Sequence, residues 1–83
     1  MNKDLYKKAQ RGLELIENSI KDLLSYKIEG LSNSEIARAL GLESSHENKQ
    51  KDYLTYSVIG NLMEKGIIKK VKEGRKVRYI LNE

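Results

Sequence analysis

The sequence predicts a mainly α-helical domain with a small β-hairpin at its C-terminus. Apolar residues recur every three or four positions near the N-terminus, which is the period of one face of a helix. A capping motif at residues 32–35 begins a second helical stretch, and the C-terminal stretch alternates apolar with basic residues around an acidic residue and a glycine. With 83 residues and no internal repeat, residues 1–83 are expected to form one domain.

The first predicted helix covers residues 3–27 and is followed by Gly30, which breaks it. Its apolar stripe consists of Leu5, Ala9, Leu13, Ile16, Ile20, Leu23 and Leu24. A helix of about 24 residues is about 36 Å long, which exceeds what the thin core of so small a domain can cover. We therefore expect its N-terminal end either to project and pair with a second copy of the chain, or to pack across the hairpin.

The second predicted helix covers residues 32–40. Ser32 and Glu35 have the spacing of a capping box, and Gly41 can adopt the left-handed conformation that ends a helix. Arg38 is expected to point outward. The buried side of this helix is expected to consist of Ile36, Ala37 and Leu40.

The third predicted helix covers residues 49–65, with Gly66 as its stop signal. Its buried side is expected to carry Leu54, Val58, Ile59 and Leu62. Its other side carries Lys49, Tyr53, Tyr56, Ser57 and Gly60. Since glycine inside a helix costs about 1 kcal/mol relative to alanine, we expect another group, either the first helix or a phosphate, to approach closely at Gly60.

The predicted hairpin covers residues 67–81, with Glu73 and Gly74 as its turn. One face is expected to carry Val77, Tyr79 and Leu81, and the other Lys76 and Arg78.

Positive charge is concentrated in this hairpin. The chain has 16 Lys and Arg against 12 Asp and Glu, yet residues 1–64 have a net charge of −1 and residues 65–83 of +5. A basic element on a nearly neutral body indicates a phosphate-binding surface. The alternative is a solvated strand pair, because lysine also prevents exposed strand edges from pairing with other chains.

The chain resembles the winged helix-turn-helix family of DNA-binding domains over about residues 10–81. The resemblance rests on the second helix with its ending Ala39-Leu40-Gly41-Leu42, on the third helix and on the basic hairpin. The resemblance implies that the third helix lies in the major groove and that the hairpin, or wing, contacts the phosphate backbone. The implied recognition-helix contacts are Asn48, Lys49, Gln50, Tyr53, Tyr56 and Ser57. The implied wing contacts are Lys69, Lys70, Lys72, Arg75, Lys76 and Arg78. Ser34 and Arg38 are further candidates for backbone contact.

One feature departs from the family pattern. The seven residues between Gly41 and Lys49 exceed the 3–4-residue turn of a helix-turn-helix. Either the third helix begins earlier, near Ser44 or Ser45, or the turn contains an insertion. The run from Gln50 to Ser57 is also similar to one in small winged-helix modules that accompany restriction endonucleases, which implies no nuclease activity here.

Several classes of function are not expected. The chain has no cysteine and one histidine, His46, and it contains no glycine-rich phosphate loop. We therefore expect no catalytic residue, no metal site and no cofactor. Neither a secretory signal nor a membrane span is visible, so we expect a soluble, cytoplasmic protein.

The expected partner is double-stranded DNA, bound by a transcription regulator or by the DNA-reading module of a larger system. If about five wing cations contact phosphate, log affinity should fall with log salt at a slope of about −4 to −5. The alternative is a protein-docking module, because a fold does not determine a function and tyrosine is common at protein interfaces.

Overall fold

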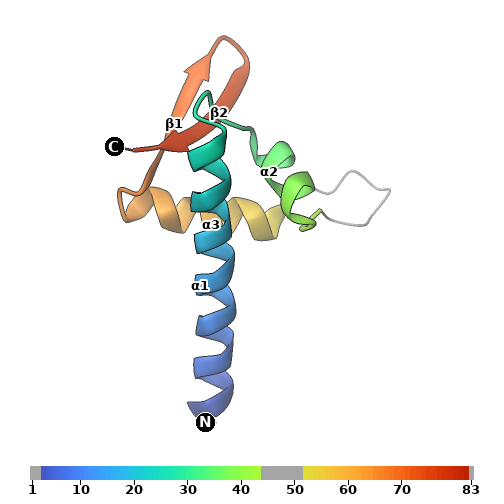
Figure 1. Cartoon of the computed structure of the whole chain (residues 1–83), viewed down its shortest axis with the longest axis vertical. Helices are drawn as coiled ribbons and strands as arrows, with labels where there is room; N and C mark the ends of the chain where they lie inside the picture. The colour runs from blue at the N-terminus through green and yellow to red at the C-terminus, as the bar shows by residue number, and fades with distance from the viewer. Residues whose placement is uncertain (1–2, 44–51, 83) are drawn as a thin grey trace.

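The computed structural model describes residues 3–43 and 52–82, which form three helices and a C-terminal antiparallel hairpin (Figure 1). The elements are α1 (Lys3–Tyr26), α2 (Asn33–Leu40), α3 (Tyr53–Glu64), β1 (Ile68–Glu73) and β2 (Lys76–Leu81). The predicted class, mainly α-helical with a small β-hairpin, is confirmed. The molecule is flat, with extents of 46 × 36 × 20 Å, and α1 runs along its long axis.

The N-terminal half of α1 projects from the body (Figure 1). Every residue from Lys3 to Arg11 is exposed, including Leu5 at 62%, and the first fully buried side chains are those of Glu17 and Ile20. The helix ends at Tyr26, within one residue of the predicted range 3–27. The alternative in which its first turns pack across the hairpin is wrong, because the body covers only the C-terminal half of the apolar stripe.

α2 forms as its sequence predicts. The Ser32 side chain accepts a hydrogen bond from the Glu35 amide at 3.2 Å, and the Ser32 amide donates to the Glu35 carboxylate at 2.9 Å. Gly41 ends the helix with φ of 71°, in the left-handed region. Ile36 and Ala37 are fully buried, whereas Leu40 is half-buried.

α3 is shorter than the predicted residues 49–65. It begins at Tyr53, with Asp52 as the N-cap residue in a non-helical conformation. Leu54 was expected in the core but is 52% exposed, and Thr55 is fully buried in its place. The reason is geometric: at 100° per residue the buried face of α3 is centred on Thr55, and Leu54 lies 100° away from it around the helix.

Two glycines differ from expectation. An added Cβ at Gly60 would meet nothing within 4 Å, so the expected approach of α1 there is wrong, and the alternative of a phosphate stays a prediction. Such an approach occurs instead at Gly30, where a Cβ would lie 2.8 Å from Cγ2 of Ile80 and 3.1 Å from the carbonyl oxygen of Tyr79. The connection between α1 and α2 therefore passes directly against β2.

The hairpin pairs Ile68 with Leu81 at its base and Glu73 with Lys76 at its tip. The two-residue turn is therefore Gly74-Arg75, with Gly74 at φ of 62°, and not the predicted Glu73-Gly74. A glycine with positive φ at the first turn position matches the twist of the strands, so the turn forms one residue later than the acidic residue suggested.

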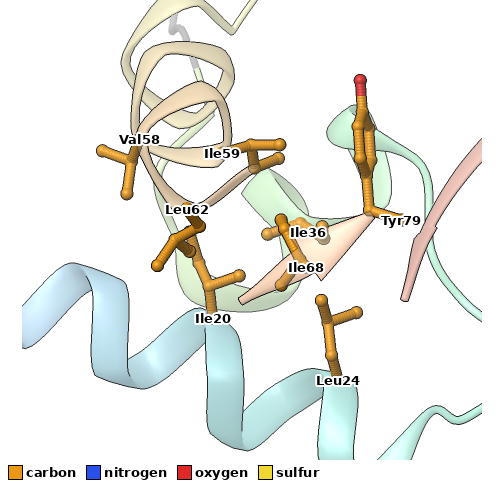
Figure 2. Packing of buried hydrophobic residues seen from close by; sticks show 8 residues of the cluster. All are labelled: Ile20, Leu24, Ile36, Val58, Ile59, Leu62, Ile68 and Tyr79. Carbon is orange, nitrogen blue, oxygen red and sulfur yellow. The ribbon is translucent and has the colours of Figure 1, made fainter. Parts of the chain in front are cut away.

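The core lies where the C-terminal half of α1, the helices α2 and α3, and the base of the hairpin meet (Figure 2). Its fully buried apolar side chains include Ile20, Ile36, Ile59 and Leu62. Leu31 and Tyr79 exchange backbone hydrogen bonds of 2.8 and 3.2 Å, which fix the α1–α2 connection to the free edge of β2. The wing thus contacts the helical body in two ways, through the core side chains at its base and through the backbone of β2 at Tyr79.

Candidate nucleic-acid interface

An open hollow of about 610 Å³ lies between the N-terminus of α2, the N-terminus of α3 and the wing. Its lining includes Ser34 from α2, Tyr56 from α3 and Arg75 from the turn of the hairpin. The structure thus brings together three of the predicted DNA-contacting residues, each from a different element.

The two helix N-termini at this hollow are tied to each other. The Asn33 side-chain amide donates to the Asp52 carbonyl oxygen at 3.4 Å, across 19 residues of sequence. Unpaired amides at a helix N-terminus favour an anion, although the Asp52 carboxylate opposes one here. Sequence reasoning did not select Asn33 or Asp52, because only their tertiary placement brings them to the hollow.

Tyr79 forms one wall of the hollow and also belongs to the core. It is 3% exposed, and its phenolic oxygen points away from Ile36 and Ile68 (Figure 2). Burial, followed by the charge that Tyr56 would carry, raises the pKa of Tyr79 above its ordinary value of 10.0. The phenol is therefore neutral at physiological pH.

The basic residues of the wing lie on two different faces. Lys70 is paired with Tyr79, and Lys72 with Val77, so these two lysines lie on the face that carries Tyr79 and borders the hollow. We call this the tyrosine face of the wing. Lys69 and Lys76 lie on the opposite face, and Arg75 lies at the tip.

The opposite face of the wing is partly neutralised. Arg78 donates to the Glu29 carbonyl oxygen at 2.9 Å and to the Glu73 carboxylate at 2.6 Å. A second hollow beside it, lined by Arg75 and Lys76, also contains Glu29 and Glu35. The Arg78 side chain therefore attaches the wing to the end of the α1–α2 connection, and less positive potential remains on this side.

The remaining predicted contacts are scattered. Ser57 is exposed on α3, and Arg38 is exposed and forms an ion pair with Glu43 at 3.5 Å. Asn48, Lys49 and Gln50 lie outside the described residues.

The exposed face of α3 is aromatic and not basic. Tyr53, Leu54 and Tyr56 are 62%, 52% and 56% exposed, and the helix from Tyr53 to Glu64 contains no Lys or Arg. Among residues 3–43 and 52–82, the cation that lines the hollow, Arg75, therefore comes from the wing. The sequence prediction placed Leu54 in the core, so it did not select this residue as part of the exposed surface of α3.

Within residues 3–43 and 52–82, no helix is long and apolar enough to cross a membrane, and no three potential metal-binding side chains gather. Comparison with known proteins finds no family model, no curated protein and no solved structure that matches this chain.

Proposed function

We propose that this chain is a winged helix that binds double-stranded DNA, with α3 in the major groove and the tyrosine face of the wing on the adjacent phosphates. The observation that carries the proposal is the hollow at which the N-termini of α2 and α3 meet the wing. Ser34, Tyr56 and Arg75 all border it, so a single duplex could contact all three elements.

The wing supplies the charge for this contact. Lys70 and Lys72 are exposed on the tyrosine face and Arg75 is exposed at the hollow, and lysine meets phosphate as a point charge. These residues give affinity and salt dependence, whereas any choice of sequence would come from α3 and the residues before it. We place the protein in the cytoplasm, as a transcription regulator or the DNA-reading module of a larger system, acting as a homodimer through α1.

A comparison of two charge-matched variants tests which face of the wing binds. Lys70→Gln/Lys72→Gln removes two cations from the tyrosine face, and Lys69→Gln/Lys76→Gln removes two from the opposite face, all four residues being exposed. We expect the first variant to flatten the salt slope of DNA binding by about 1.8 and the second to change it much less. Equal effects of the two variants would contradict the assignment of the tyrosine face.

Protein docking is a second candidate, favoured by the exposed Tyr53, Leu54 and Tyr56 on an α3 without cations. Aromatic residues are enriched at protein interfaces. Under this proposal Tyr53→Ser/Leu54→Ser would abolish a protein complex while the intact chain showed no affinity for duplex DNA at low salt. Salt-dependent DNA binding that is lost when Lys70 and Lys72 are changed would exclude it as the main function.

A further inference from the structure

We propose that the projecting half of α1 pairs in antiparallel orientation with the same segment of a second copy of this chain. This specifies the homodimer included in the proposed function. It does not depend on DNA binding, because the segment lies at the opposite end of the molecule from the tip of the wing (Figure 1).

The projecting segment carries an apolar stripe that the body leaves exposed. At 100° per residue, Leu5, Ala9, Gly12, Leu13 and Ile16 fall within about 100° of the helix circumference. Leu5 and Ala9 are exposed, and the other three are half-buried. The same stripe continues into the core at Ile20 and Leu24, so one continuous apolar face is covered at its C-terminal end only.

The charges of α1 favour a second copy in antiparallel orientation. Residues 3–11 carry four cations and one acid, a net charge of +3, whereas the next segment, residues 12–18, carries two acids and no cation, a net charge of −2, with Glu17 also bound to Lys65 of its own chain. A parallel pair would place +3 against +3. An antiparallel pair places each basic segment beside the acidic segment of the other copy, and this arrangement also has the two-fold symmetry that most dimers adopt.

The small residues define the register. When Ala9 of one copy lies opposite Gly12 of the other, the helices can approach closely at the two-fold axis, since a Cβ at Gly12 meets nothing within 4 Å in the single chain. Leu5 then lies beside Ile16 of the second copy. There an apolar hollow of about 150 Å³, lined by Leu15, Ile16, Ser19, Leu40 and Leu42, is open to receive it.

Sedimentation of the full chain tests the pairing. We expect the mass to approach twice 9.6 kDa as the concentration rises from about 1 µM to about 1 mM. Ala9→Arg places a cation on the stripe, whereas Asn18→Arg places the same charge 180° away on the helix, and both positions are exposed, so neither variant disturbs the core. The first should raise the dissociation constant at least tenfold and the second should not.

Cysteine cross-linking tests the orientation, since the chain has no cysteine of its own. An equimolar mixture of Ala9→Cys and a mass-tagged Gly12→Cys should form the mixed disulfide faster than either variant forms a disulfide with itself. Faster self-linking by each variant would indicate a parallel pair and overturn the proposal. A chain that stays monomeric to about 1 mM, or equal weakening by both arginine variants, would also overturn it, whatever the result with DNA.

Discussion

Gly30 is the residue at which the α1–α2 connection passes closest to the hairpin. Its φ is 96°, and an added Cβ would lie 2.8 Å from the Ile80 side chain and 3.1 Å from the Tyr79 carbonyl oxygen. Only glycine combines this conformation with so little space. The residue therefore does more than interrupt a helix: it permits the hydrogen bonds between Leu31 and Tyr79 that hold the wing.

Changing Gly30 to alanine should reduce the free energy of unfolding by about 2 to 4 kcal/mol, from backbone strain together with overpacking. Gly60→Ala is the control, because Gly60 lies inside α3 with nothing within 4 Å of the new Cβ. It should raise stability by about 1 kcal/mol. Urea denaturation of both variants measures these changes, and a loss of stability at both positions would contradict the geometry.

The burial of Tyr79 predicts a loss of stability at alkaline pH. Its pKa is raised above 10.0 in the folded state, so above about pH 10 the unfolded chain releases the phenolic proton first and unfolding becomes more favourable. The contribution of the Tyr79 phenol to the free energy of unfolding is fully present below pH 10 and decreases as the pH rises toward the raised pKa. Denaturation from pH 8 to 11 should show a steeper decline for the intact chain than for Tyr79→Phe. Parallel declines would contradict the prediction.

At the scale of elements, an ion pair joins α1 to Lys65, the residue that ends α3. The ammonium group of Lys65 lies 3.1 Å from both carboxylate oxygens of Glu17, whose side chain is only 10% exposed. Because the carboxylate is nearly buried, the contact contributes more than a surface ion pair, although the Lys65 side chain is 54% exposed.

A double-mutant cycle with Glu17→Gln and Lys65→Met should give a coupling free energy of about 0.5 to 1.5 kcal/mol. The exposed pair of Arg38 and Glu43, at 3.5 Å, is the control and should give less than about 0.5 kcal/mol. Chemical denaturation of the single and double variants measures both values. A smaller coupling at Glu17 than at Glu43 would contradict the role of burial.

The elements themselves could be predicted from the sequence wherever a local interaction determines them. The capping box at Ser32, the left-handed Gly41 and the alternation of the strands are all local, and all are confirmed. The burial of Leu54 and the approach of α1 to Gly60 were wrong because the packing of α3 on the body decides which face of the helix is buried, and no local pattern records that packing. For the same reason the hollow could not be predicted, since Asn33 and Asp52 meet only through tertiary packing.

At the scale of the whole molecule, the wing and the projecting end of α1 lie at opposite ends of the 46 Å long axis. If two copies pair about Ala9 and Gly12 in antiparallel orientation, their wings lie roughly 70 Å apart, which is about two helical turns of DNA. If the wings contact phosphates as proposed, the dimer should protect the DNA backbone at two places about 20 base pairs apart. Hydroxyl-radical footprinting measures this spacing, and protection at two places one helical turn apart would contradict it.

The alternation of the wing also changes the number of phosphate contacts. Lys69 and Lys76 lie on the opposite face and Arg78 is held by Glu29 and Glu73. Three of the six wing cations are then left for the proposed phosphate contact, namely Lys70 and Lys72 on the tyrosine face and Arg75 at the hollow. The expected salt slope is then about −2.7 per chain, lower than the slope that five cations would give.

The most direct test of DNA binding by the tyrosine face is fluorescence anisotropy of a labelled mixed-sequence duplex, titrated with the full chain over a series of salt concentrations. We expect binding at low salt with a slope of about −2.7 per chain that flattens in Lys70→Gln/Lys72→Gln. Absence of binding at low salt, or a slope shallower than about −1 that this variant leaves unchanged, would contradict it.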